Sequence, residues 1–533
     1  MHLVVMVLCL TVLFKLYINE VLLGTTFGII IGPNVANLID PRSWGAQEKI
    51  TLEVMRVVLA TGLFIIGVEL NNRDRRGPGL PPTKYLWRHA KGLLVMIVPT
   101  MAIGWVLIAG FLKALFRQLD FISCLAISAC LTPTDPIISA AIVGGSFAVR
   151  YVPLNIRQLI SAESAANDGL AYPFLTIALY LTLESSVGVA MEKWILIGCL
   201  YQVVFGVIFG SVLGLAFSFL MKLSLKRGYV DKESYLALLL ALALLTMGIA
   251  TTIGTDDLLA SFAAGSAVSW DGDFNRHIEN EAFATIIDFV LNSACFIYIG
   301  AWLPFRDFNS EVLGIDLWRL FVLFVAVAFL RRIPASLVLY KWIPEVQNWK
   351  EAMFCGHFDS LIYLPGPMGV GAVFVSSLAL TKLPKPQDPP QSQAEVLAAT
   401  IQPIVSFVVL GSILFHGLSV VILSLTLGWR SRSRTLVSPH KADVQGLGLP
   451  IASVRPDTIN TLQGTPGLGA VDNSSRFQMM AMRRNPSKQG TQSDDEIAST
   501  LKAVRSDAES QSGPVSTGLS GVTTRTSTSI DPH

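Results

Sequence analysis

The sequence predicts an all-α polytopic membrane protein with about 13 transmembrane helices and a disordered C-terminal tail. Hydrophobic residues make up 52% of the chain and charged residues only 15%, whereas soluble domains carry about 25% charged residues. The apolar runs are long and continuous rather than alternating, which excludes an outer-membrane β-barrel. Two of these runs are also interrupted by proline and glycine, a pattern typical of transporters built from inverted repeats.

Each predicted span is an apolar stretch bounded by polar residues. In chain order the spans are Leu3–Tyr17, Val21–Ile39, Leu52–Leu70, Leu93–Phe116, Phe121–Gly145, Leu154–Leu183, Trp194–Met221, Tyr235–Ala250, Leu258–Trp270, Phe283–Leu303, Leu317–Trp342, Phe354–Leu380 and Ala399–Leu427. The first is short and could be a signal sequence, but Lys15 follows its apolar stretch and no small-residue cleavage site is present. We therefore expect a first helix. In the second span, small residues such as Gly24 and Gly28 predict close helix packing.

Clusters of lysine and arginine follow the third, fifth, seventh, eleventh and thirteenth spans, and the positive-inside rule places such loops in the cytoplasm. This predicts an N-terminus outside the cell and a C-terminus inside it. The acidic loop Asp271–Glu281 is an exception. We expect residues 1–428 to form the membrane domain and residues 429–533, which are rich in Ser, Thr, Gly and Pro, to form a disordered cytoplasmic tail.

The six cysteines show neither the spacing of metal ligands nor that of a disulfide framework. We expect no cofactor and no nucleic-acid partner.

The fifth span is interrupted by Thr132-Pro133-Thr134-Asp135-Pro136, and the twelfth contains Gly366, Pro367 and Gly369. Non-helical backbone at membrane depth is tolerated only where it is buried or lines a watery cavity. Proline and glycine are also common in ordinary membrane helices, but two breaks in corresponding halves favour a transporter with crossed broken helices. Asp135 then neutralises the positive ends of two half-helices, an architectural role that we favour over ion binding.

Two carboxylates, Glu163 and Asp168, lie within the sixth span. Ionisable residues inside the membrane usually mark an ion or proton pathway. At about 100° per residue, Ser164 and Asp168 share one helix face, and Glu163 and Asn167 share the next. The alternative is that a basic residue elsewhere neutralises each acid, which we favour for Glu163. Arg331 and Arg332 lie deep in the eleventh span, and we expect a Glu163–Arg332 ion pair with Arg331 as the second choice.

Desolvation of a carboxylate disfavours its charged form, so Asp168 could hold either a proton or a small cation in turn. Such competition is sufficient for exchange. Hard oxygen ligands suit an alkali cation, and the hydroxyl groups of Ser164, Thr132 and Thr134 could supply them. Asn167 adds polarity beside Asp168 without adding charge.

Several motifs together resemble the fungal plasma-membrane sodium/proton antiporters of the monovalent cation:proton antiporter superfamily, which has the NhaA/NhaP-like fold. The motifs fall in the family's order and are T-P-T-D-P (Thr132–Pro136), E-S-x-x-N-D-G (Glu163–Gly169), D-D-L-L-A-S-F-A-A-G (Asp256–Gly265), R-R-I-P (Arg331–Pro334) and G-P-M-G-V-G-A-V-F (Gly366–Phe374).

The resemblance implies an antiporter, not an enzyme, that exchanges cytoplasmic Na+, and often K+ or Li+, for external H+ across the plasma membrane. It implies a homodimer with a mobile core domain, and it makes Asp168 the transient cation and proton site, supported by Asn167, with Thr132 and Ser164 nearby. Asp256 and Asp257 match an acidic pair of the family, and we leave open whether they line the transport path or cap a helix.

The chain departs from the family pattern in two places. It begins close to its first helix, where relatives usually carry a leader. The segment Asp359–Pro365 also separates Gly356-His357-Phe358 from Gly366. If this insertion is part of the folded protein, it puts bulky residues into the second broken helix.

Other classes of protein explain the buried acids less well. An intramembrane aspartyl protease needs two catalytic aspartates, usually with a Gly-x-Gly-Asp signature, and that signature is missing from the sequence. A monovalent cation channel favours an open polar filter over a single competing carboxylate. A cation-coupled symporter is the remaining alternative.

Overall fold

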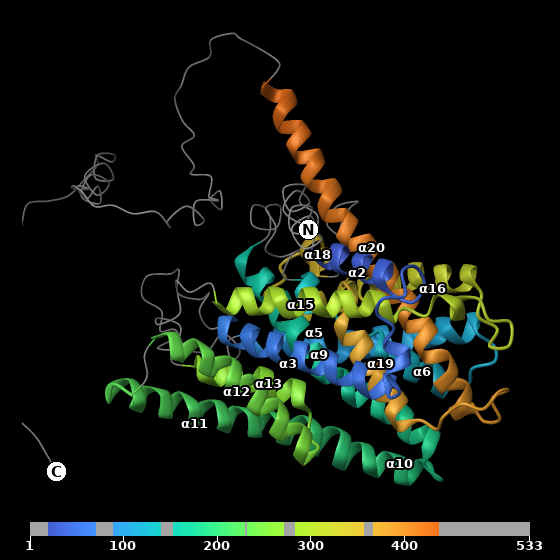
Figure 1. Ribbon diagram of the computed structural model, residues 1–533, viewed down its shortest axis with the longest axis horizontal. Helices are drawn as coiled ribbons and strands as arrows, with labels where there is room; N and C mark the ends of the chain where they lie inside the picture. The colour runs from blue at the N-terminus through green and yellow to red at the C-terminus, as the bar shows by residue number, and fades with distance from the viewer. Residues whose placement is uncertain are drawn as a thin grey trace, which may run out of the picture. The chain divides into compact units, whose positions relative to one another are not determined.

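The computed structural model describes residues 20–70, 89–139, 153–229, 232–270, 283–355 and 366–435, which all belong to the first of two units, Met1–Pro439 and His440–His533. The regular elements within these ranges are helices (Figure 1). In chain order they are α2 (Glu20–Ile31), η1 (Pro41–Trp44), α3 (Gln47–Leu70), α5 (Ala90–Leu115), α6 (Phe121–Cys130), α9 (Leu154–Leu183), α10 (Val187–Lys193), η3 (Trp194–Phe205), α11 (Gly206–Lys226), α12 (Lys232–Ile253), α13 (Asp257–Val268), α15 (Phe283–Trp302), η4 (Phe305–Phe308), α16 (Leu317–Leu330), α17 (Ile333–Leu339), η5 (Tyr340–Trp342), α18 (Trp349–Cys355), α19 (Val370–Lys382) and α20 (Gln393–Thr435).

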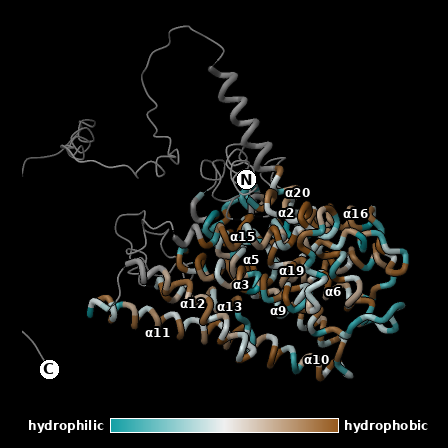
Figure 2. The backbone as a smooth tube through the Cα atoms, in the orientation of Figure 1, coloured by the Kyte–Doolittle hydropathy of each residue, from teal (hydrophilic) through white to brown (hydrophobic). Residues whose placement is uncertain are grey.

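Among the described residues, five helical stretches are long and apolar enough to cross a membrane. They are Gln47–Leu70, Ala90–Leu115, Val187–Lys226, Leu317–Trp342 and Gln393–Leu418. Shorter apolar helices, including α6, α13 and α19, pack among them. Hydrophobic residues are spread over these helices rather than confined to one side (Figure 2), as expected where lipid rather than water surrounds a bundle.

Glycine brings several helices into backbone contact. Gly28 of α2 lies so close to α15 that a Cβ atom there would come within 2.0 Å of the Ile297 carbonyl oxygen. Gly210 and Gly214 of α11 face α13 in the same way. A Cβ atom at these positions would lie 2.1 and 2.4 Å from the carbonyl oxygens of Ala260 and Ala264, respectively. Close packing of small residues is a main source of helix association in membranes, and the packing expected for the second predicted span is confirmed.

Helix α2 is shorter than the second predicted span. Helix α2 ends at Ile31 rather than at Ile39, and residues 33–36 form turns. Pro33 explains this end, because proline disfavours helical backbone at the residue before it and donates no backbone hydrogen bond. Asn37 has a φ of 51°, the left-handed conformation that asparagine tolerates in turns.

The eleventh predicted span is not one continuous helix. A turn at Arg331 and Arg332 separates α16 from α17, and Pro334 in the first turn of α17 accounts for the interruption. The seventh predicted span is longer than Trp194–Met221, because α10, η3 and α11 run on from Val187 to Lys226 through a π-helical segment.

Two other boundaries agree with the sequence. Helix α9 has the predicted bounds, Leu154–Leu183, and α6 stops at Cys130, immediately before the first predicted break. The predicted first span, the insertion Asp359–Pro365 and nearly all of the predicted tail lie outside the described residues.

Candidate ion-binding site

The two interrupted segments meet in the interior of the helical bundle. After α6 the backbone has no regular secondary structure at residues 133–135, and it has none again at residues 366–368 before α19. The Asp135 amide donates a hydrogen bond to the Pro367 carbonyl oxygen at 2.8 Å, which ties one break to the other. Oδ2 of Asp135 accepts from the Val370 amide at 2.9 Å, and its Oδ1 accepts from the Ile137 amide at 2.8 Å. One carboxylate therefore serves the amide ends of both helical segments, as predicted for an architectural acid.

Arg331 serves the carbonyl groups that the breaks leave without helical partners. Its guanidinium donates to the carbonyl oxygens of Leu131 at 2.6 Å, Pro133 at 3.0 Å and Gly366 at 2.7 Å. Gly366 has a φ of +31° and lies against this side chain. Asp135 and Arg331 thus satisfy opposite ends of the broken helices, and Arg331 is not the partner of Glu163.

Glu163 pairs instead with Arg332, whose Nη2 lies 2.7 Å from the Glu163 Oε2 atom. Asn167 donates to the other carboxylate oxygen of Glu163 at 2.7 Å, and its own side-chain oxygen accepts from the Thr134 amide at 3.1 Å. The Thr134 hydroxyl donates to Ser164 at 3.3 Å. These buried groups form one polar network that joins α9 to the first break.

Asp168 lies at the middle of α9 and is 1% exposed. Within the described part of the chain, neither of its carboxylate oxygens has a hydrogen-bond partner. Oδ1 lies 2.5 Å from the position of a Cβ atom at Gly371, so the absence of a side chain there makes room for the carboxylate. A buried carboxylate without protein donors is costly unless a proton or a cation neutralises it.

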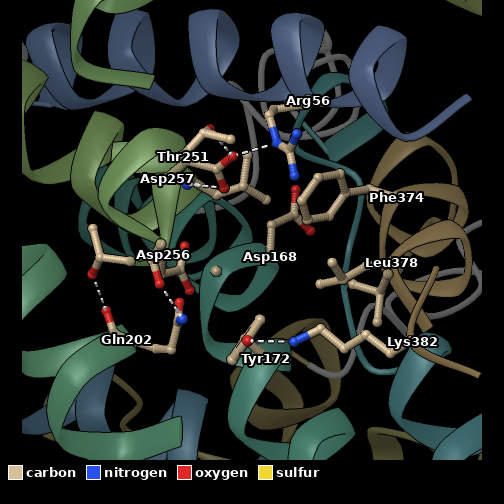
Figure 3. A pocket seen from close by; sticks show the side chains of 15 residues that line it. Arg56, Asp168, Tyr172, Gln202, Thr251, Asp256, Asp257, Phe374, Leu378 and Lys382 are labelled. Atoms are coloured by element: carbon tan, nitrogen blue, oxygen red, sulfur yellow. Dashed lines mark hydrogen bonds and ion pairs between the residues drawn. The ribbon is translucent and has the colours of Figure 1, made fainter. Parts of the chain in front are cut away.

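Asp168 lines a cavity of about 190 Å³ between α3, α9, the α12–α13 turn and α19 (Figure 3). Its other lining residues are Arg56, Gly169, Tyr172, Gln202, Thr251, Gly254, Thr255, Asp256, Asp257, Leu258, Phe374, Val375, Leu378 and Lys382. The cavity can accommodate a small cation with several waters, and its wall carries three carboxylates and two basic side chains.

The two acids at the α12–α13 turn have different environments. Asp257 forms an ion pair with Nε of Arg56 at 2.5 Å and accepts from the Thr251 hydroxyl at 3.0 Å. Asp256 caps α13 by accepting from the Leu259 amide at 2.9 Å. Its Oδ2 atom has no hydrogen-bond partner among the described residues. The pair therefore caps a helix and lines the cavity at the same time.

The predicted site residues fall into two groups. The network around Glu163 takes in Asn167, Ser164 and Thr134, while Asp168 faces the cavity. The Thr132 hydroxyl donates to the Ala129 carbonyl at 2.8 Å. In the described residues, no hydrogen bond links Thr132, Thr134 or Ser164 to Asp168.

Sequence reasoning missed the roles of the cavity residues Arg56, Tyr172 and Lys382, and of Gly371, which makes room for the Asp168 carboxylate. Arg56 also contacts Glu53, three residues before it on the same helix, and this local pair is the one that the sequence suggests. An arginine within a predicted span was the available signal for its second partner. Lys382 gave no comparable signal because it lies at a helix C-terminus, where a lysine is ordinary. Tyr172 gave none because it is uncharged.

The fold and the site together define a multi-pass transporter with a buried carboxylate at paired helix breaks. The sodium proton antiporter MjNhaP1 from Methanocaldococcus jannaschii has a similar fold, with a TM-score of 0.55 and 18% identity over 79% of this chain and 93% of that one. In addition, the family model for the transmembrane sodium/hydrogen exchanger matches residues 3–426. The chain belongs to the sodium/hydrogen exchanger family, whose members are transporters and not enzymes.

Curated fungal relatives agree with this assignment. A probable Na+/H+ antiporter of Schizosaccharomyces pombe is 39% identical over 420 residues, which are 77% of this chain and 53% of the relative. A Na+/H+ antiporter of Saccharomyces cerevisiae is 39% identical over 423 residues, covering 77% and 41%. A second antiporter of S. pombe is 38% identical over 416 residues, covering 77% and 85%. The chain therefore spans about half the length of the first two relatives.

Proposed function

We propose that this protein exchanges cytoplasmic Na+, and also K+ and Li+, for external H+ by alternating access. The Asp168 carboxylate carries the proposal. It is fully buried in a helix at the centre of the bundle, lacks a protein donor among the described residues and borders a cavity of about 190 Å³. Asp168 binds either the proton or the metal ion, and the carrier reorients only when one of them neutralises this charge.

The polar network beside Asp168 supports a separate role for Glu163. Its charge is already compensated by Arg332 and by the Asn167 amide. Asp168 is therefore the acid whose charge depends on the transported ions. In another state of the carrier, the hydroxyl groups of Ser164, Thr132 and Thr134 give up their present hydrogen bonds and bind the cation. Asp256 and Asp257 line the path of the cation through the cavity.

The membrane topology that we propose has thirteen spans in two inverted repeats, with the N-terminus outside and the C-terminus inside. Hydrogen bonds between distant loops support it. Gln118 donates to the Leu313 carbonyl, and the Asp120 amide donates to Gln393 at 3.2 Å, so segments assigned to the outer side contact one another. His89 and Glu345, both assigned to the inner side, lie 2.6 Å apart.

The remaining proposals are supported by the resemblance to the fungal antiporters. Residues 1–428 form the exchanger domain, and residues 429–533 form a cytoplasmic tail. The expectation of a tail that is disordered from residue 429 is corrected at its start, because α20 continues through residues 429–435. The protein works as a homodimer in the plasma membrane, where it removes sodium and contributes to salt tolerance and pH regulation.

The test measures exchange in proteoliposomes that contain the full chain and a pH-sensitive dye. We expect the wild type to release protons when Na+ is added, with a half-saturating Na+ concentration that increases as the pH falls, because protons and Na+ compete. Asp168→Asn should reduce the signal to that of empty vesicles. The control is Asp307→Asn, which makes the same chemical change at an exposed residue of η4.

Exchange by Asp168→Asn at the wild-type rate contradicts the proposal. Na+ flux that saturates but has no coupled proton movement identifies a channel instead. Proton and Na+ movement in the same direction identifies a symporter. A second readout is growth of salt-sensitive yeast that lacks its own sodium exporters, in which the wild type should restore growth and Asp168→Asn should not.

A further inference from the structure

Lys382 is the last residue of α19 and lines the same cavity as Asp168. Its ammonium group donates a hydrogen bond to the Tyr172 hydroxyl at 3.0 Å and lies 5.2 Å from the centroid of the tyrosine ring. Tyr172 follows Asp168 by one turn of α9, so its side chain lies on the same helix face. Figure 3 shows Lys382 reaching from α19 across to Tyr172.

The two basic side chains of the cavity differ in how their charges are compensated. Arg56 forms ion pairs with Asp257 and Glu53. Lys382 forms no ion pair within the described part of the chain, and its partner there is an uncharged phenol. One wall of the cavity thus carries the ammonium of Lys382, an exposed residue with no ion pair among the described residues, and another wall carries the unpartnered carboxylate of Asp168.

We propose that Lys382 is a built-in electrostatic competitor that sets the apparent affinity of the cavity for the transported cation. The inference rests on the proposed role of Asp168 in cation binding. The fixed positive charge repels an entering alkali cation and partly compensates the empty carboxylate, so it weakens cation binding without blocking the path. Tyr172 is a positioning residue, because its hydroxyl and ring hold the flexible lysine at this wall.

The test is a Na+ titration of the thermal unfolding of the full chain in detergent, with ionic strength held constant by choline chloride. Lys382→Met should lower the half-saturating Na+ concentration by about three- to tenfold, the size of effect that one unit charge has across a partly solvated cavity. Lys382→Arg keeps the charge and should bind Na+ like the wild type. Tyr172→Phe keeps the ring and should change the half-saturating Na+ concentration less than Tyr172→Leu does. In Asp168→Asn, stabilisation by Na+ should disappear.

Added salt gives a second readout, because screening weakens the field of Lys382. The difference between Lys382→Met and the wild type should shrink as choline chloride is increased. The inference is overturned if Lys382→Met has the same half-saturating Na+ concentration as the wild type. It is also overturned if Lys382→Met and Lys382→Arg change this concentration equally, because that result indicates a packing role.

Absence of any Na+-dependent stabilisation in the wild type also overturns the inference. The exchange assay then separates the two proposals. If the Lys382→Met shift in binding is present but wild-type proteoliposomes exchange no protons, only the proposed antiport fails. If exchange occurs and the half-saturating concentration is unaltered by Lys382→Met, only the role of Lys382 fails.

Discussion

Asp135 and Val370 are 235 positions apart in the sequence, yet the Asp135 carboxylate accepts the Val370 amide hydrogen bond at 2.9 Å. The same side chain accepts from Ile137 and Ile138 at the start of its own helical segment. One buried acid therefore fixes the crossing of two chain breaks. Asp135 stabilises this crossing because the three amide groups would otherwise lack hydrogen-bond partners.

Asp135→Asn replaces an acceptor-only group by one that also carries two donors. We expect it to lose at least one of the three amide hydrogen bonds. The loss of a hydrogen bond to a charged group costs about 1.5–3 kcal/mol. The measurement is thermal unfolding in detergent, with Asp307→Asn as the matched surface change. Equal stability of Asp135→Asn and the wild type contradicts the architectural role.

The Glu163–Arg332 ion pair leads to a test by a double-mutant cycle. Removing one partner of a buried pair leaves an uncompensated charge, which costs about 3–5 kcal/mol. Glu163→Gln and Arg332→Gln should each destabilise the protein by this amount. The double variant should be more stable than the sum of the two losses predicts, because no lone charge remains. Additive losses in thermal or chemical unfolding argue against a direct pair.

Much of this arrangement could be predicted from the sequence. The bounds of α9, the positions of both breaks and the Glu163–Arg332 pair depend on local signals: an apolar run, proline and glycine, and the scarcity of charge inside a membrane. Pro33 also marks the end of α2, because proline disfavours helical backbone at the residue before it.

The cavity could not be predicted in the same way. Arg56 and Asp257 are 201 positions apart, and Tyr172 and Lys382 are 210 apart, so each pair exists only through tertiary packing. The sequence shows Glu53 at i−3 from Arg56, and an arginine within a span indicates a further partner without identifying it as Asp257. Backbone contact at Gly371 is equally invisible, because glycine in a membrane helix has many explanations.

Gly371→Ala tests whether the Asp168 carboxylate needs its present position. The new methyl group would lie 2.5 Å from Oδ1 of Asp168 and 3.1 Å from Cβ of Pro133. We expect a folded protein that has lost Na+-dependent stabilisation and exchange. Gly248→Ala is the matched control, since no atom outside its own helix lies within 4 Å of the added Cβ. If Gly371→Ala binds Na+ with the wild-type affinity, the Asp168 carboxylate does not need its present position in order to bind the cation.

Arg56 offers a comparison of its two partners within one cluster. The Glu53 side chain is 47% exposed, whereas that of Asp257 is 9% exposed. Exposed pairs contribute about 0–1 kcal/mol, and breaking a buried pair costs about 3–5 kcal/mol. Glu53→Gln should therefore change thermal stability little, while Arg56→Gln should destabilise strongly by leaving Asp257 unpaired between α3 and α13. Adding Asp257→Asn to Arg56→Gln removes that lone charge and should restore part of the stability, whereas adding Glu53→Gln should not. Rescue by Glu53→Gln instead of Asp257→Asn would show that the helix-local pair, and not the contact across the cavity, holds Arg56 in place.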